Sequence, residues 1–255
     1  MLNYDQAAVF ILILIRISAF LAAGPLFVFP NVPQTAKAGL ALALTVVLFP
    51  VVASPSFHVP GGLLGFGLLA AREAATGLAI GFVTGLVFQS LTIAGQIMDI
   101  QMGFYMANLF DPMMGQQATI TSRFLYLLGM VLFFILDGHH VLIAALAKSF
   151  DLVPLDGLAL TGAGTLAVIR VFAQTVALGV QIAAPVVAVV LIVNICLGLL
   201  GRTAPEMNVF MLGFPLQIGL GLLTLSVMAP LLGVVFRSLA QLMESNLYIV
   251  LKGMH

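Results

Sequence analysis

The chain has 255 residues, of which 62% are hydrophobic and only 7% are charged, whereas an ordinary soluble domain carries about 25% charged residues. This composition excludes a soluble globular protein, because the chain has too few polar groups to cover a water-facing surface, and its surroundings must be lipid, other apolar subunits, or both. Nine Lys and Arg balance nine Asp and Glu, so no basic excess would attract nucleic acid and no nucleic-acid partner is expected.

Six apolar segments are candidates for membrane-crossing or buried helices, since a helix needs about 20 residues to cross about 30 Å of hydrocarbon. In chain order they cover residues 7–29, 38–53, 62–93, 124–136, 171–200 and 207–236. The second and fourth are short, and prolines inside or at the ends of several segments favour kinks or breaks. We therefore predict an all-α fold of about six apolar helical segments with kinks, rather than a regular lipid-embedded bundle.

The positive charges do not predict an orientation. Cytoplasmic loops of membrane proteins carry an excess of Lys and Arg, but here the two sets of alternate loops tie. One set holds Lys37, Arg123 and Arg202, and the other holds Lys148, Arg237 and Lys252. The side of the membrane on which the N-terminus lies stays open.

A stripe of small residues with polar ends marks the third apolar segment. Glu73, Gly77, Gly81, Gly85 and Gln89 recur every four positions, which places them on one slowly drifting face of a helix. Small residues at this spacing let another backbone approach closely. The pattern predicts a helix-packing seam, with a polar partner for Glu73 on another element.

The fifth segment carries a second polar stripe, because Arg170, Gln174 and Gln181 fall within about 40° of one another on a helix. We interpret it as an interhelical hydrogen-bonding stripe. A transport pathway is the less favoured alternative, since polar groups inside a membrane do mark pathways.

The centre of the chain is rich in methionine. Met98, Met102 and Met106 stack four positions apart if the helix continues that far. Asp111-Pro112 then favours a turn, and Met113 and Met114 follow in a loop that ends near Gly115. Methionine adapts to irregular gaps, and a loop of Met, Leu and Phe inside a pore would block water and ions. Ordinary core filling is an equally weighted alternative.

No catalytic motif stands out, and we expect neither an enzyme nor a bound cofactor or metal. The best candidate is Asp137-Gly138-His139-His140. Adjacent histidines are expected to diverge on a regular element, and a cap or polar turn is the favoured interpretation.

Several motifs together resemble the FliR family of export-gate subunits of the bacterial flagellar type III secretion apparatus. They are Gln101-Met102-Gly103-Phe104, Phe110-Asp111-Pro112, Asp137-Gly138-His139, the run from Arg202 to Asn208, and Gly213-Phe214-Pro215. The resemblance covers nearly the whole chain. It implies a FliP-like portion over residues 1–165, and a FliQ-like helical hairpin with a C-terminal tail over residues 166–255.

The resemblance also implies a function and partners. FliR-like proteins assemble with FliP and FliQ into a closed pore for unfolded rod, hook and filament proteins. They work with FlhA and FlhB in the flagellar basal body of the bacterial inner membrane, in contact with lipid, and much of the assembled chain is raised out of the membrane plane. Transport is coupled to the proton gradient and assisted by a separate ATPase.

In that family, the loop that matches residues 106–122 forms a plug in the channel. Carried over by position, the plug begins at Met106, and its sealing residues are Leu109, Phe110, Met113 and Met114. The residues that shape its turn are Asp111, Pro112 and Gly115.

Two other functions remain as alternatives. One is the related subunit of the virulence injectisome, which shares fold and role. The other is a secondary transporter, which broken helices and polar stripes would allow.

Overall fold

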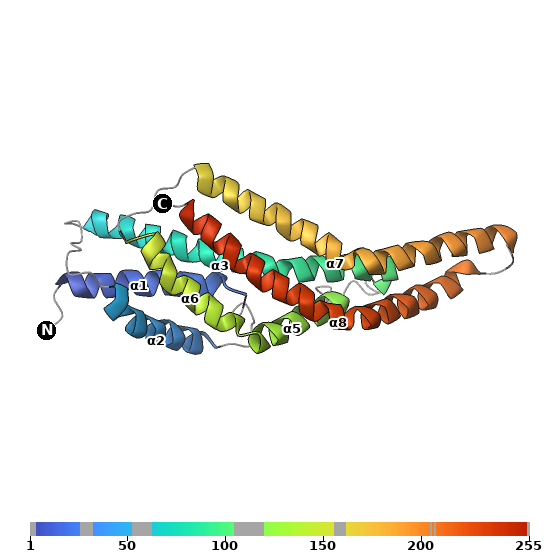
Figure 1. Ribbon diagram of the computed structural model, residues 1–255, viewed down its shortest axis with the longest axis horizontal. Helices are drawn as coiled ribbons and strands as arrows, with labels where there is room; N and C mark the ends of the chain where they lie inside the picture. The colour runs from blue at the N-terminus through green and yellow to red at the C-terminus, as the bar shows by residue number, and fades with distance from the viewer. Residues whose placement is uncertain are drawn as a thin grey trace. The chain divides into compact units, whose positions relative to one another are not determined.

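The structure is a computed structural model that describes residues 4–25, 33–52, 63–104, 120–155, 162–204, 206 and 208–253. These residues form seven helices and no strand, as the predicted all-α class requires (Figure 1). The helices are α1 (Tyr4–Ala23), α2 (Gln34–Val52), α3 (Leu63–Met102), α5 (Ile120–Ile135), α6 (Gly138–Leu152), α7 (Gly162–Thr203) and α8 (Val209–Lys252).

Five of the described helices, α1, α2, α3, α7 and α8, are long and apolar enough to cross a membrane. A sixth span results if the bent pair α5 and α6 crosses as one unit. α2 has 19 residues, so the segment predicted to be short is long enough for one crossing. α3, α7 and α8 have 40, 42 and 44 residues, about twice the length that the hydrocarbon core requires.

One break lies away from any proline, although the prolines were predicted to favour kinks or breaks. α7 continues through Pro185, and α8 continues through Pro215 and Pro230. The 73° bend instead lies at residues 136–137, where Asp137 has a left-handed backbone with φ 55°. α6 was not among the six predicted segments, because its histidines and charged residues interrupt the apolar run.

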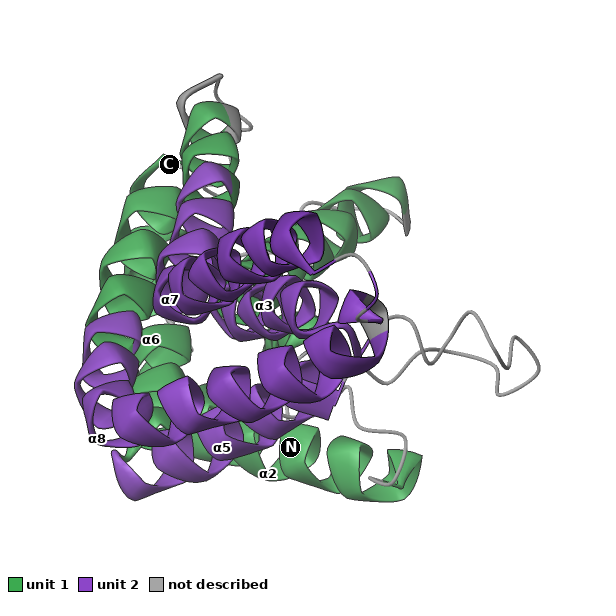
Figure 2. Ribbon diagram, turned by 90° about the vertical axis from the view of Figure 1, so that its right-hand side faces the viewer, with its two compact units in different colours: residues 1–86, 137–172, 240–255 green, residues 87–136, 173–239 purple. Residues whose placement is uncertain are grey.

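The chain divides into two compact units, coloured separately in Figure 2. Unit 1 comprises residues 1–86, 137–172 and 240–255, and unit 2 comprises residues 87–136 and 173–239. The helices α3, α7 and α8 each contribute a part to both units. The expected division into portions 1–165 and 166–255 stays a prediction.

Each unit has its own apolar core. In unit 1, Leu12, Ile13 and Ile17 of α1 are fully buried, as are Ile80 of α3 and Leu146 of α6. In unit 2, the fully buried side chains include Leu91, Met98 and Met102 of α3, Leu125 of α5 and Leu232 of α8. Two residues of the predicted methionine stripe, Met98 and Met102, therefore fill the core of unit 2.

Candidate functional site

The residues predicted to form the plug lie outside the described residues. This applies to Met106, Leu109, Phe110, Asp111, Pro112, Met113, Met114 and Gly115. The structure does describe the chain on both sides of them, up to Phe104 and again from Ile120. The contacts of these flanking residues, all in unit 2, define where the loop leaves α3 and where it enters α5.

On the downstream side, a buried carboxylate holds the start of α5. Asp99 of α3 is fully buried, and its two oxygens accept hydrogen bonds from the backbone N–H groups of Thr121, at 3.1 and 3.2 Å, and Ser122, at 3.3 Å. The first N–H groups of a helix have no partner within the helix, and the positive end of the helix dipole favours a negative charge there. Asp99 thereby supplies from α3 the cap that α5 needs.

A close approach of the two backbones accompanies this cap. A Cβ atom on Gly95 would lie 2.2 Å from Cα and 2.4 Å from N of Ser122. The Ser122 hydroxyl also donates a hydrogen bond of 3.2 Å to the Thr92 carbonyl oxygen. Only glycine at position 95 lets α3 and the first turn of α5 lie this close.

On the upstream side, α3 ends at a glycine. Gly103 has φ +86°, a left-handed conformation that glycine adopts without penalty and that commonly ends helices. A Cβ atom on Gly103 would lie 2.8 Å from Cδ1 of Phe214 in α8. The preceding residue, Met102, packs on Gly221 of α8, where an added Cβ would lie 2.3 Å from the methionine sulfur.

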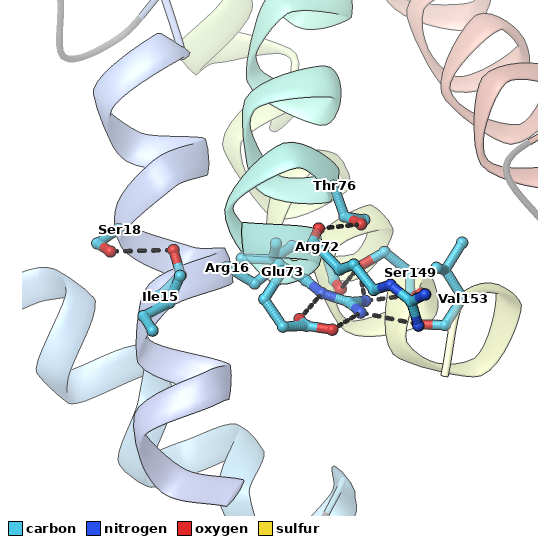
Figure 3. Close-up of polar contacts among 9 residues, drawn as sticks. Ile15, Arg16, Ser18, Arg72, Glu73, Thr76, Ser149 and Val153 are labelled. Atoms are coloured by element: carbon cyan, nitrogen blue, oxygen red, sulfur yellow. Dashed lines mark hydrogen bonds and ion pairs between the residues drawn. The ribbon is translucent and has the colours of Figure 1, made fainter. Parts of the chain in front are cut away.

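In unit 1, Glu73 meets a basic partner on another helix. Arg16 of α1 and Glu73 are 0% and 2% exposed, and they form a bidentate ion pair with distances of 2.5 Å from Nε to Oε2 and 2.9 Å from Nη2 to Oε1 (Figure 3). An unpaired charge inside an apolar protein is very costly, and the planar fork of arginine matches a carboxylate. The two charges thus compensate each other.

The same guanidinium group also binds the end of α6. Arg16 donates hydrogen bonds to the carbonyl oxygens of Ser149, at 3.0 Å, and Val153, at 2.8 Å. Its Cζ lies 4.1 Å from the ring centroid of Phe150. The Ser149 carbonyl oxygen also accepts the Val153 N–H, at 2.9 Å, whereas the Val153 oxygen lies at the helix end, where carbonyls lack helical partners and favour a cation. Arg16 therefore joins α1, α3 and α6 through one buried side chain (Figure 3).

The glycines that follow Glu73 face α1. A Cβ atom on Gly77 would lie 2.2 Å from the Arg16 carbonyl oxygen, and one on Gly81 would lie 2.7 Å from the Ala23 Cβ. Gly85 is less close, at 3.6 Å from the Ala23 carbonyl oxygen. Gln89, the last residue of the predicted stripe, is exposed.

The second polar stripe is exposed in the structure of the single chain. Arg170, Gln174 and Gln181 all belong to α7, and each is exposed. Arg170 lines a groove in unit 1 together with residues of α8.

The histidine motif forms a polar turn, but its histidines do not diverge. Asp137 occupies the N-cap position of α6 without a side-chain cap hydrogen bond. The ring centroids of His139 and His140 lie 4.2 Å apart. One potential metal-ligand atom from each of Asp137, His139 and His140 lies within 4.8 Å of the other two. Asp137 and His140 already contact each other at 3.3 Å. The proximity arises because the break at Asp137 places its carboxylate beside the first turn of α6.

Sequence reasoning missed Asp99, Gly95 and Arg16 as individual determinants of the structure. A signal was present for two of them, since Asp99 and Arg16 are charged residues within apolar runs, where a partner is expected. The sequence did not say which distant residue that partner would be.

Comparison with known proteins identifies the family of this chain. Residues 7–243 match the model of the family described as "Bacterial export proteins, family 1". The chain is 33% identical to the flagellar biosynthetic protein FliR of Bacillus subtilis (strain 168), over 93% of this chain and 92% of that protein. It is 35% identical to FliR of Caulobacter vibrioides, over 87% of this chain and 89% of that protein.

A third relative is FliR of Escherichia coli (strain K12), with 31% identity over 86% of this chain and 83% of that protein. These relatives are named for flagellar biosynthesis and export rather than for an enzymatic reaction. Because residues 7–243 match one family model and three flagellar relatives align with most of the chain, the chain belongs to family 1 of the bacterial export proteins, the family of the FliR flagellar biosynthetic proteins.

Proposed function

We propose that this chain is a structural and gating subunit of the flagellar type III protein export gate in the bacterial inner membrane. In this proposal it assembles with FliP and FliQ into a closed pore, works with FlhA and FlhB, and passes unfolded rod, hook and filament proteins. Membership of the export family carries the proposal.

The exposed apolar surface of the long helices supports an assembly role. Only 33% of the apolar window in α7 and 17% of that in α8 is buried inside the chain. Side chains such as Leu166, Ile192 and Val227 are 60% or more exposed. Surface of this kind must be covered by lipid or by other subunits, and helices of 42 and 44 residues extend beyond one bilayer core. Neighbouring FliP and FliQ subunits would cover the part that lipid does not reach.

The contacts at both ends of the predicted plug support the gating role. Asp99 and Gly95 hold the start of α5, and Gly103 ends α3 against Phe214. A plug needs rigid ends, because a seal made of weak apolar contacts must return to the same place after a polypeptide has passed.

The gating mechanism that we propose involves no covalent chemistry. Apolar side chains of the plug, with Phe110, Met113 and Met114 at its centre, exclude water and ions from the channel. The adaptable thioether side chains can deform when an unfolded polypeptide enters and then pack again. The energy for transport is supplied by the partners and by the proton gradient.

The first experiment is to co-express the chain with the neighbouring FliP-like and FliQ-like proteins and to measure the mass of the purified complex by native mass spectrometry. One copy of this chain bound to several FliP and FliQ subunits is the expected result. A stable monomer or homodimer that ignores these proteins would contradict the proposal and favour a transporter that works alone.

The second experiment tests the seal in the same complex. We expect Phe110→Ala combined with Met113→Ala to raise ion leakage across liposomes that contain the complex. The matched control combines Phe172→Ala with Met211→Ala, since both side chains are more than half exposed and lie outside the predicted plug. Equal leakage from the two double variants would refute the assignment of the plug.

A further inference from the structure

Two neighbouring grooves in unit 1 share the residues Tyr248 and Ile249 near the end of α8. The first, with a volume of about 550 Å³, lies between α6 and α8. The second, of about 580 Å³, lies between the start of α7 and the last residues of α8. Both volumes fall within the range of about 300–1,000 Å³ that is typical of sites for small molecules.

Positive charge gathers around these grooves. Lys148 of α6 lines the first, and Arg170 of α7 and Lys252 of α8 line the second. Glu244 is the one acidic residue among those that line either groove. Three cations face one anion, in a chain whose total charge is zero. The surroundings of Tyr248 therefore favour a ligand with negative charge.

The rest of the lining is mostly apolar. Val141, Leu152, Leu247 and Leu251 line the first groove, and Leu166 and Ala167 line the second. A ligand that fits must combine an anionic group with hydrocarbon. A free inorganic anion would leave the apolar surface exposed, and a simple hydrocarbon would leave the cations without partners.

Tyr248 has the character of a residue at a membrane interface. Its side chain is 47% exposed, and its ring centroid lies 5.7 Å from the Lys148 Nζ, within the range of a cation–π contact. Tyrosine is enriched at the level of lipid headgroups, because its ring is apolar and its hydroxyl is polar.

The positions of the three cations along their helices also agree with a place at the level of the lipid headgroups. Lys252 is the last residue of α8, Lys148 lies in the last two turns of α6, and Arg170 lies in the third turn of α7. Charged groups near the ends of membrane helices extend toward the headgroups. Basic pockets between such helices are a known mode of binding anionic lipid.

We propose that the two grooves bind an anionic phospholipid. Arg170 and Lys252 bind its phosphate, Lys148 and Tyr248 contact the headgroup from the other side, and an acyl chain lies along the apolar lining. The site does not depend on the proposed gating function, because it needs only that the helices of unit 1 lie in a membrane.

The test uses the full-length chain in a mild detergent and measures the binding of two probes, phosphatidylglycerol and phosphatidylcholine with the same acyl chains, by native mass spectrometry. We expect phosphatidylglycerol to bind more tightly. The double variant Arg170→Gln/Lys252→Gln should weaken its binding about 30-fold, which corresponds to about 1 kcal/mol for each charge removed. Arg170→Lys should keep most of the preference, since the charge remains.

A matched control removes the same two charges elsewhere. Lys37→Gln/Arg237→Gln changes one lysine and one arginine that line neither groove, and it should leave phosphatidylglycerol binding within about twofold. Because Arg170 and Lys252 are exposed, their replacement should leave the helical content unchanged by circular dichroism.

Four results would overturn the proposal. The first is equal binding of the two lipids, and the second is an equal loss in the two double variants. The third is that glycerol phosphate, which lacks acyl chains, competes for the grooves as strongly as the lipid does, since the grooves would then recognise a free anion. The fourth, measured on the chain co-expressed with its FliP-like and FliQ-like neighbours, is loss of a subunit rather than of lipid from the Arg170→Gln/Lys252→Gln variant, because the occupant would then be a protein.

Discussion

Replacement of Glu73 by glutamine removes the negative charge from the most buried ion pair in the described part of unit 1. Arg16 is then left fully buried with its positive charge opposed only by neutral oxygens. Removal of one partner of a buried pair costs about 3–5 kcal/mol. The glutamine oxygen can still accept one hydrogen bond, and the carbonyls of Ser149 and Val153 still accept two, so we expect a loss near the lower limit, about 3 kcal/mol.

Unfolding of the purified protein by SDS in mixed micelles, followed by circular dichroism, measures this loss. The double variant Arg16→Met/Glu73→Leu should recover part of it, because a neutral apolar pair leaves no buried charge. The recovery should be incomplete, since the Val153 carbonyl loses its Arg16 donor and the Ser149 carbonyl keeps only the Val153 N–H, and an unmade hydrogen bond costs about 1–3 kcal/mol.

The control variant is Arg72→Gln, because Arg72 directly precedes Glu73 on α3 but is only half-buried. In Figure 3 the carbonyl oxygen of Arg72 accepts the hydrogen bond of the Thr76 hydroxyl, and this contact survives the substitution. We expect a loss of at most about 1 kcal/mol. The reasoning would be refuted by a Glu73→Gln variant as stable as the unmodified protein, or by an Arg72→Gln variant that is equally destabilised.

Three further predictions concern the close helix contacts, and the same unfolding assay measures the first two. Gly77→Ala should destabilise the protein by about 1–3 kcal/mol, because the new Cβ would lie 2.2 Å from a backbone oxygen of α1. In the control variant Gly39→Ala the new Cβ meets open space, and the variant should stabilise α2 by up to about 1 kcal/mol. Gly95→Ala should cost more than Gly221→Ala, since the first meets backbone atoms and the second meets only the flexible side chain of a methionine; an equal cost would contradict this. Asp99→Asn should speed hydrogen exchange at the first amides of α5 by about 10-fold or more, because a charged cap contributes about 1.5–3 kcal/mol, and unchanged exchange would show that this cap does not hold the helix.

Much of the fold was predictable because it depends on local composition and period. The apolar runs predicted helices, and the helices α1, α3, α7 and α8 lie where those runs do. The four-residue spacing of Glu73, Gly77, Gly81 and Gly85 indicated a close helix contact, since such spacing defines one face whatever the partner is. The family motifs pointed in addition to the export role.

Helix ends and breaks were less predictable. α3 continues to Met102, beyond the apolar segment that ends at Ile93 and through the spacing of Met98 and Met102. The buried Asp99 is accommodated there because backbone N–H groups of α5 bind its carboxylate. The break at Asp137 depends on one residue in a left-handed conformation, and local preferences only weakly indicate such a residue.

Composition and period alone establish that this protein is apolar, helical and suited to a membrane, because hydrophobicity and helical period are properties of neighbouring residues. Which charges compensate each other depends instead on the packing of the helices. Arg16 is 57 positions from Glu73 and 133 from Ser149, and Asp99 is 22 positions from the amide that it caps. A buried charge requires a partner, but the identity of that partner follows from which helices pack together, and no local pattern specifies this.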